Sequence, residues 1–219
     1  MNKILVLVEG QTEETIVGDV LNPHLAPAGV FLRPVILKTK REKWGTSFKG
    51  GVTSVRQVLG DLRALLGDSS AVAVTTLIDY YGLPVDFPGL ANRPSGTGHQ
   101  RVAHVEMAFA AAIDDRRFVP HLTLHEIEAW IFVDPTKCAL ELNGAATAKK
   151  LKEIRDNCGG PEAINDNPST APSKRILAIV PEYQKPFHGP LALTKIGMPS
   201  VRASCPHASS WLSQLERLG

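Results

Sequence analysis

The sequence predicts an α/β protein, with a parallel sheet of about four strands flanked by helices and a C-terminal helical lobe. Three observations support this fold class. Over residues 1–132, apolar runs of strand length alternate with helix-forming stretches in the order β-α-β-α-β-α-β-α, which is the order of a sheet with crossover helices. Several of these runs are apolar on both faces, as buried parallel strands require. The remainder of the chain shows helical patterns and no strand pattern.

The first strand, helix and strand are predicted from the N-terminal segment. Residues 3–8 form an apolar run that stops at Glu9. The helix that follows begins near Thr12, which can cap it, and acids occupy its first turn, where the helix dipole favours them. We expect Asn22-Pro23 to end this helix. The segment 30–38 alternates and contains β-branched residues, so it is the second predicted strand.

The middle of the chain supplies the third strand and two more helices. Residues 40–53 are a basic, glycine-containing loop, which is either solvated or in contact with phosphate. The apolar spacing over 55–66 predicts an amphipathic helix. A strand is expected at 71–78, a loop at 83–98 and a helix at 101–113.

The fourth strand is predicted at residues 118–124, and a helix opens directly after it. A lysine-rich helix at 145–157, a short helix from Ser173 and a terminal helix that contains Trp211 follow, separated by loops rich in glycine and proline. We expect an α/β core at residues 1–135 and a helical lobe at residues 136–219, packed together as one compact unit.

The composition excludes several classes of protein. With 43% hydrophobic and 21% charged residues, the chain has the apolar mass of a globular domain. No apolar segment reaches the length of about 18 residues that a membrane span needs, and the N-terminal run is too short for a secretory signal. We therefore expect a cytoplasmic protein. The three widely spaced cysteines indicate neither a disulfide framework nor a zinc knuckle, and the net charge of +2 permits nucleic-acid binding without demanding it.

Acids follow three of the four predicted strands. Glu9 follows the first, Asp79 ends the third, and Glu126 and Glu128 follow the fourth. Parallel strands point the same way, so these side chains should converge on one edge of the sheet, where open α/β sheets bind ligands. Several carboxylates without cysteine are typical of a Mg²⁺ or Mn²⁺ site. Each acid alone could equally cap a helix or solvate a loop.

Two of these acids and two of their neighbours have open roles. On a helix Glu126 and Glu128 diverge by roughly 200°, so both reach one cation only if the helix starts after Glu126. We favour Glu126 as the closer ligand and Glu128 as a supporting group or a ligand of a second ion. Glu13 lies one turn beyond Glu9 and either faces the same site or only the helix dipole. His125 is expected to be a hydrogen-bonding neighbour rather than a ligand.

Basic residues of the C-terminal half are candidates for phosphate contacts. Lys174 and Arg175 follow a proline that can start a helix, so they form either a phosphate grip or a solvated pair. Lys185 and Arg202 lie in a glycine-interrupted tail and could line the same groove. One cysteine and one histidine in Cys205-Pro206-His207 do not build a zinc site.

Five motifs resemble those of the DUF4276 family of small prokaryotic proteins, whose sheet resembles the Toprim domain of topoisomerases, primases and OLD-type nucleases. The motifs occur in the family's order. They are Val8-Glu9-Gly10-Gln11-Thr12-Glu13, Asp79-Tyr80-Tyr81-Gly82-Leu83-Pro84, His125-Glu126-Ile127-Glu128-Ala129-Trp130, Thr170-Ala171-Pro172-Ser173-Lys174-Arg175, and Ile196-Gly197 through Cys205-Pro206-His207 with Trp211.

The resemblance implies a Toprim-like sheet and a metal-dependent nuclease. In Toprim enzymes a glutamate after the first strand acts as general acid/base or metal ligand, and an Asp-x-Asp pair after a later strand holds the metal. Glu9 matches the glutamate and Asp79 the first aspartate, but Tyr81 stands at the second. Catalysis would then rest on Glu9, Asp79 and Glu126, with Glu128 completing a Mg²⁺ or Mn²⁺ site. Such proteins are often encoded beside an AAA- or ABC-type ATPase in phage-defence loci.

Three functions stay open at this point. The first is a nuclease that acts on DNA or RNA, with or without an ATPase partner. The second, which Tyr81 favours, is a catalytically degenerate nucleic-acid-binding or adaptor subunit of an ATPase complex. The third is a phosphatase or phosphotransfer enzyme that uses the same acids. The sequence also leaves open whether the chain forms a homodimer.

Overall fold

The computed structural model describes residues 1–37, 52, 54–139, 144–164, 167 and 169–219, so most of the predicted basic loop lies outside the described residues. Within them the predicted fold class is confirmed. The strands are β1 (Asn2–Val8), β2 (Val30–Ile36), β3 (Ala73–Asp79), β4 (Phe118–Val119) and β5 (Leu122–Thr123). They form a sheet in the order β2-β1-β3-β4, with β5 also paired to β3, and every pair is parallel.

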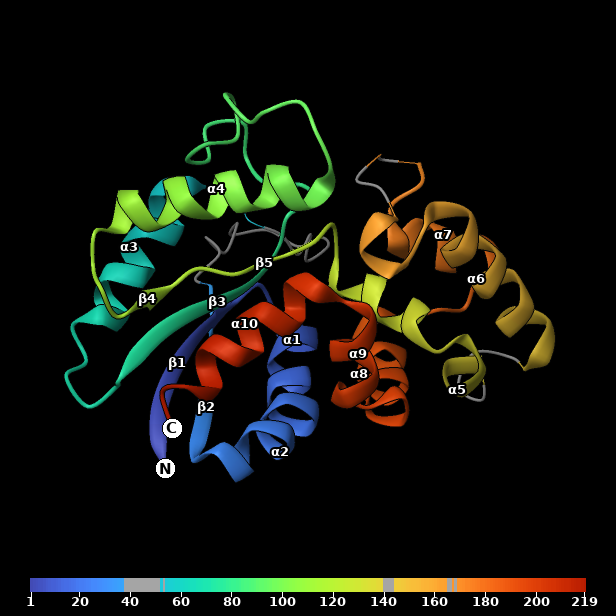
Figure 1. Ribbon diagram of the computed structural model, residues 1–219, viewed down its shortest axis with the longest axis horizontal. Coiled ribbons are helices and arrows are strands. Elements are labelled where there is room, and N and C mark those ends of the chain that lie inside the picture. Colours follow the sequence, from blue (N-terminus) through green and yellow to red (C-terminus); the bar gives the residue numbers. More distant parts are fainter. Residues whose placement is uncertain (38–51, 53, 140–143, 165–166, 168) are drawn as a thin grey trace, which may run out of the picture.

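Helices cover both faces of this sheet (Figure 1). Helices α3 (Val55–Leu66) and α4 (Gly98–Ile113) lie on one face. The other face carries α1 (Gln11–Ile16), the π-helix η1 (Val17–Leu21), α2 (Asn22–Leu25), the 3-10 turn η2 (Ala26–Ala28), α8 (Lys185–Ile196), α9 (Met198–Ser204) and α10 (Pro206–Glu216). Beyond the carboxyl end of the sheet lie η3 (Ile127–Val133), α5 (Pro135–Ala139), α6 (Ala145–Cys158), η4 (Pro161–Ala163) and α7 (Pro172–Ile179).

Alternate residues of β1 divide the hydrophobic core into two layers, because successive side chains of a strand point to opposite faces. Leu5 and Leu7 pack with α3 and α4, whereas Ile4, Val6 and Val8 pack with α1 and the C-terminal helices. None of the helices in the described part of the chain is long and apolar enough to cross a membrane.

The terminal helix α10 is part of the main core rather than an appendage. Trp211 is buried, and its indole nitrogen donates a hydrogen bond of 2.9 Å to the hydroxyl of Thr75 in the middle of β3. The C-terminal segment therefore completes one face of the sheet. The division into residues 1–135 and 136–219 stays a prediction, and residues from both parts share this hydrophobic layer.

The prediction that Asn22-Pro23 ends the first helix is wrong. Helical backbone continues through α2 and η2 to Ala28, and Gly29 ends it with a φ of +76°. A proline in the first turn of a new helical segment has no hydrogen bond to lose, so Pro23 is tolerated after the π-helix. The side chain of Asn22 instead bonds the backbone N–H and C=O of Leu32 in β2.

The predicted fourth strand is interrupted, and two helices of the tail were not predicted. Pro120 offers no N–H to the sheet, so β4 and β5 are separate; the Thr76 hydroxyl bonds both the N–H and the C=O of His121 in the gap. Helices α8 and α9 lie where we expected loops. Their sequences contain glycines and prolines that hide the helical pattern, although proline in a first turn favours a helix start.

Candidate functional site: a carboxylate cluster around Lys185

Five acidic side chains gather at the carboxyl edge of the sheet. We call them the carboxylate cluster, and they are Glu9, Glu13, Asp79, Glu126 and Glu128. Three of them surround the ammonium of Lys185, whose Nζ lies 3.2 Å from Asp79 Oδ2, 3.2 Å from Glu128 Oε2 and 3.4 Å from Glu13 Oε1. The predicted convergence of Glu9, Asp79, Glu126 and Glu128 on one edge is therefore present in the structure, and Glu13 joins them.

Glu9 links the ends of the two central strands. Its Oε1 accepts a hydrogen bond of 2.7 Å from the backbone N–H of Asp79. Gly10 follows in an extended conformation and α1 begins at Gln11, which turns Glu13 back toward the strand ends. Burial raises the pKa of Glu9 well above its ordinary value, and the negative charges of Asp79 and Glu13 add to this effect against the opposing charge of Lys185.

Asp79 ties β3 to the turn that follows β5. Its Oδ1 accepts a hydrogen bond of 2.9 Å from the N–H of Ile127, the first residue of η3, while Oδ2 faces Lys185. His125 sits just before this turn with a φ of +66°, and its carbonyl accepts a hydrogen bond of 2.8 Å from the N–H of Tyr81. His125 and Tyr81 thus brace the backbone that positions the acids.

Glu126 and Glu128 point to different partners. The backbone of Glu126 is extended, and the helical turn η3 starts at Ile127. The helix thus starts after Glu126, which is the condition under which both glutamates could reach one cation. Both oxygens of Glu126 accept hydrogen bonds from Ser173 in the first turn of α7, from its N–H at 2.8 Å and its hydroxyl at 3.0 Å. Glu128 is 1% exposed, and neither of its oxygens has a hydrogen-bond partner among the described residues.

The cluster holds more negative charge than its one ammonium can balance. Burial raises the pKa of Glu128 to about 7, with Asp79 and Glu126 adding to the rise and Lys185 opposing it. The pKa values of Glu13 and Glu126 are also raised, chiefly by burial. Burial would lower the pKa of Lys185, but the surrounding carboxylates raise it well above its ordinary value, so the ammonium stays charged.

The close approach of α8 to α1 places Lys185 in the cluster. Gly189 has no side chain at the contact, and a Cβ there would lie 3.4 Å from the Tyr183 hydroxyl and 3.7 Å from Thr12 Cγ2. The side chain of Lys185 is 34% exposed, while its ammonium contacts buried acids. The sequence indicated a basic residue here but not its acidic surroundings, because α8 was not predicted.

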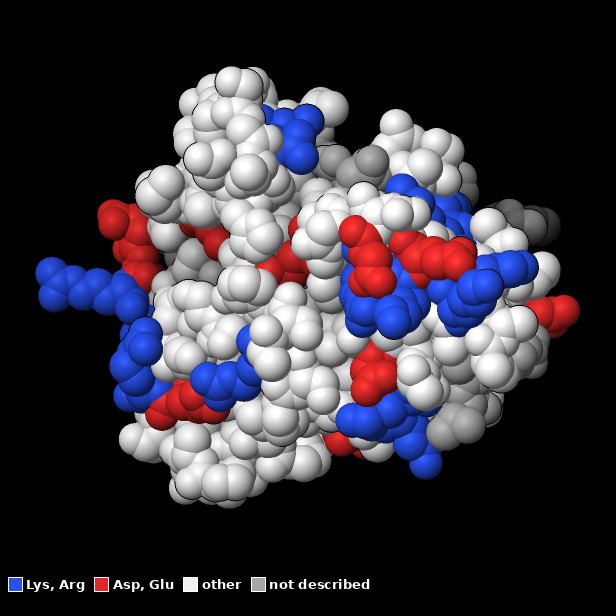
Figure 2. Space-filling model, turned by 45° about the vertical axis from the view of Figure 1, so that its right-hand side comes forward, with Lys and Arg blue, Asp and Glu red and all other residues white. Residues whose placement is uncertain are grey.

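The other basic candidates lie in two places, with Lys174 and Arg175 on α7 and Arg202 on α9. Lys174 is exposed on α7, next to the serine that binds Glu126, and Arg175 donates a hydrogen bond of 2.7 Å to the carbonyl of Thr170. Arg202 pairs with Glu216 and bonds the Ser213 hydroxyl at 2.8 Å, near the C-terminus. On the face shown in Figure 2, lysines and arginines form small groups beside acids rather than one continuous basic surface.

The donor set of the cluster fits a hard divalent cation. Its possible ligand atoms are carboxylate oxygens, which Mg²⁺ and Mn²⁺ prefer. The buried oxygens of Glu128 have no hydrogen-bond partner among the described residues, and a bound cation would supply one. The ammonium of Lys185 stands where positive charge is needed. Its distances of 3.2–3.4 Å are those of an ion pair and exceed the Mg²⁺–oxygen bond of about 2.1 Å.

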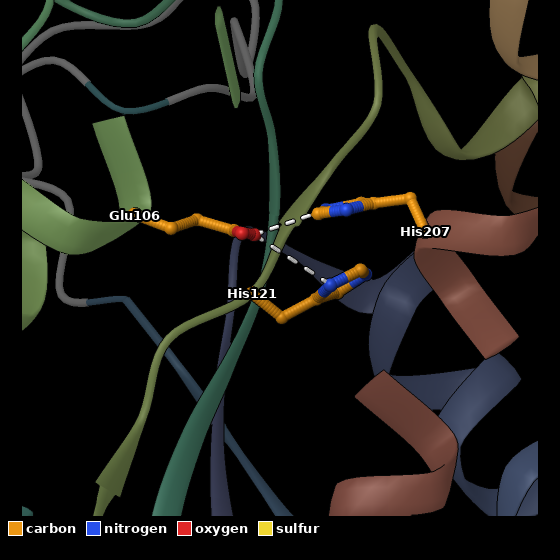
Figure 3. Close-up of side chains that lie close together, drawn as sticks. All are labelled: Glu106, His121 and His207. Atoms are coloured by element: carbon orange, nitrogen blue, oxygen red, sulfur yellow. Dashed lines mark hydrogen bonds and ion pairs between the residues drawn. The ribbon is translucent and has the colours of Figure 1, made fainter. Parts of the chain in front are cut away.

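A second group of polar side chains was not predicted. Glu106 of α4, His121 between β4 and β5, and His207 of α10 meet beside the sheet (Figure 3). Burial lowers the pKa of His121 well below its usual range, and the nearby His207 lowers it further. Burial would also lower the pKa of His207, but Glu106 and Glu162 raise it. No sequence spacing could reveal this group, because its members come from three distant segments.

Comparison with known proteins places the chain in a family. No curated protein matches it. Among solved structures, it is similar to the C-terminal region of the Burkholderia pseudomallei OLD protein, at 14% identity and a TM-score of 0.47, over 100% of both chains. The family model described as "Domain of unknown function (DUF4276)" matches residues 8–216. The resemblance found in the five motifs is confirmed, and the chain belongs to the DUF4276 family.

Proposed function

We propose that this protein is a Mg²⁺- or Mn²⁺-dependent nuclease that hydrolyses phosphodiester bonds of DNA or RNA at the carboxylate cluster. The observation that carries the proposal is the convergence of five acids, most with raised pKa values, around the ammonium of Lys185. Structural ion pairs rarely concentrate so much uncompensated negative charge, because burying it is costly. A divalent cation and a phosphate group would balance it.

The residues have distinct roles in this proposal. Asp79 and Glu128 would hold the cation, which when bound would polarise the phosphodiester and lower the pKa of a bound water. Glu126 becomes a further ligand if Ser173 releases it. The ordering of the two glutamates is therefore opposite to the sequence-based preference, because Glu128 and not Glu126 faces the centre of the cluster.

Glu9 is the proton acceptor in our proposal. Its side chain is half-buried, and its raised pKa makes its carboxylate a stronger proton acceptor than that of an ordinary glutamate. Water attacks phosphorus, its proton passes to Glu9, and the bond from phosphorus to the leaving sugar oxygen breaks, with that oxygen taking a proton from solvent. Lys185 would contact a non-bridging phosphate oxygen. Lys174, one residue after Ser173, extends this contact along the backbone of the nucleic acid.

The biological setting rests on the family resemblance. Because DUF4276 proteins resemble Toprim nucleases encoded beside AAA- or ABC-type ATPases, we propose that this chain is a phage-defence effector that works in the cytoplasm with such a partner.

The direct test is cleavage by purified protein stripped of metal. With Mn²⁺ or Mg²⁺ restored, we expect nicking of plasmid DNA or cleavage of tRNA, and a loss of about 100-fold or more in Glu9→Gln and Asp79→Asn. Glu153→Gln is the matched control, because Glu153 is an exposed acid of α6. Cleavage that is equal in all variants would come from a contaminant and would overturn the assignment.

One observation favours the second candidate, a catalytically degenerate nucleic-acid-binding or adaptor subunit. Lys185 already supplies a cation to the cluster, and Tyr81 replaces the second aspartate of the Toprim pattern. If this candidate holds, calorimetric titration with Mn²⁺ will show no binding to the cluster, while nucleic acid still binds. In the nuclease, Lys185→Ala should bind Mn²⁺ at least as tightly as the unmodified protein, because a competing charge is gone.

A further inference from the structure

Three polar side chains meet beside the edge of the sheet without a role in the proposed cleavage. Glu106 comes from the middle of α4, His121 from the gap between β4 and β5, and His207 from the first turn of α10 (Figure 3). In the view of Figure 3, the carboxylate reaches from one side and the two rings from the other. Helices that cover opposite faces of the sheet thus meet at this point.

The distances between their ligand atoms are close to those of a metal site. His207 Nε2 lies 3.0 Å and His121 Nδ1 lies 3.8 Å from Glu106 Oε1, and single ligand atoms of all three residues lie within 4.8 Å of one another. Bonds of about 2.1 Å at tetrahedral angles separate ligand atoms by about 3.4 Å. Small movements of the side chains would therefore suffice to bind one ion.

His121 is the member that most needs a ligand. It is 1% exposed, and neither of its ring nitrogens has a hydrogen-bond partner among the described residues. Its ring is held between two others, stacked on Trp211 at 4.2 Å and on His207 at 5.0 Å. A buried polar atom without a partner is costly, and most buried polar atoms in proteins have one.

The backbone around the group is anchored on both sides. Glu106 Oε1 accepts a hydrogen bond of 2.7 Å from the N–H of Leu122, whose carbonyl oxygen lies 3.2 Å from His207 Nε2. Glu162 accepts hydrogen bonds of 3.1 Å from the N–H groups of His207 and Ala208, which fixes the start of α10. Such supporting bonds orient side chains in known metal sites.

We propose that Glu106, His121 and His207 bind one divalent transition-metal ion of the zinc type, at a site separate from the carboxylate cluster. Two imidazoles with one carboxylate suit Zn²⁺ and its neighbours in the first transition row, whereas a cluster of carboxylates alone suits Mg²⁺ or Mn²⁺. The fourth position is open to water or to the Leu122 carbonyl. The bound ion joins α4, the edge of the sheet and α10, so its role is to stabilise the docking of the C-terminal helix.

The test is direct binding of Zn²⁺ and Co²⁺ to protein that has been stripped with a chelator. We expect one equivalent bound by calorimetry and a visible Co²⁺ absorption spectrum typical of nitrogen and oxygen ligands. Glu106→Gln and His121→Phe should each lower the affinity by about 100-fold or more. Phenylalanine keeps the stacking on Trp211. Circular dichroism should be unchanged in both variants, and if His121→Phe folds poorly, Glu106→Gln carries the test alone.

Two controls make the result decisive. His104→Gln changes another histidine of α4, which bonds Asn92 outside the group, and should leave Zn²⁺ and Co²⁺ binding unchanged. Glu128→Gln alters the carboxylate cluster and should also leave them unchanged. Zn²⁺ binding that survives in Glu106→Gln and His121→Phe, or that disappears in Glu128→Gln, would overturn the proposal and leave the proposed nuclease site untouched.

Discussion

The carboxylate cluster and the Glu106–His121–His207 group lie along the same strands but differ in almost every physical respect. The first collects oxygen ligands at the strand ends and holds a charged ammonium. The second collects two imidazoles and one carboxylate beside the middle of β3, against a buried indole. In our two proposals, one sheet presents two sites whose donor atoms select different cations. The first would serve catalysis, and the second would stabilise the packing of α10.

The largest expected difference between the two sites is their response to Mg²⁺ or Mn²⁺ on the one hand and Zn²⁺ on the other. After removal of metal, we expect cleavage to fall by about 100-fold or more and to return with Mn²⁺ or Mg²⁺ but not with Zn²⁺ alone. Zn²⁺ alone should raise the melting temperature by about 5–10 °C, because an ion at 100 times its dissociation constant stabilises the folded state by about 2.7 kcal/mol. Activity assays and thermal denaturation with each ion measure both effects. Full cleavage with Zn²⁺ alone would contradict the proposal that the two sites use different ions.

The next effect concerns the lysine at the centre of the carboxylate cluster. Lys185→Met should lower the free energy of unfolding by about 3 kcal/mol, at the low end for a broken buried ion pair because the side chain is 34% exposed. Mg²⁺ should restore part of the loss by replacing the missing charge. Lys174→Met, an exposed lysine of α7, is the control and should change stability by less than about 0.5 kcal/mol. Denaturant titrations measure both variants, and equal losses would refute the central role of Lys185.

The buried glutamate of the cluster should give stability a dependence on pH. Its pKa is raised to about 7 in the folded protein, so the folded state binds the proton more tightly than the unfolded state does. Its contribution is fully present below the ordinary value of 4.5 and is lost as the pH rises through about 7. Glutamine does not titrate, so Glu128→Gln should not lose this stability. Its free energy of unfolding, relative to that of the unmodified protein, should therefore increase between pH 5 and pH 8, by up to about 3 kcal/mol. If the free energies of unfolding of the two proteins, measured by denaturant titration, change equally with pH over this range, the raised pKa of Glu128 is contradicted.

Sequence reasoning reached the first site but could not reach the second. Glu9, Asp79 and Glu128 follow strand ends, and parallel strands bring their ends together, so the convergence follows from local patterns. His121 lies where Pro120 interrupts a strand, and its partners depend on where α4 and α10 pack. That docking is decided by the whole core, and no residue spacing encodes it. The same reason hid the acidic surroundings of Lys185, whose helix contains Pro186, Gly189 and Pro190.

The smallest expected effect distinguishes two basic residues of the C-terminal half. Lys174 is exposed beside Ser173 at the carboxylate cluster, whereas Arg202 is engaged with Glu216 and Ser213 near the end of the chain. Lys174→Ala should weaken nucleic-acid binding a few-fold and reduce the slope of log affinity against log salt by about 0.9, the value for one lost phosphate contact.

Arg202→Ala should instead leave that slope unchanged and lower the free energy of unfolding by about 1 kcal/mol, because the ion pair with Glu216 is partly exposed. Fluorescence anisotropy at several salt concentrations, with denaturation of the same samples, separates the two outcomes. An equal loss of salt dependence in both variants would mean that the bound strand runs from the carboxylate cluster along α9 to the end of α10. A single lost contact at Lys174 would confine it to the carboxyl edge of the sheet, where the acids converge.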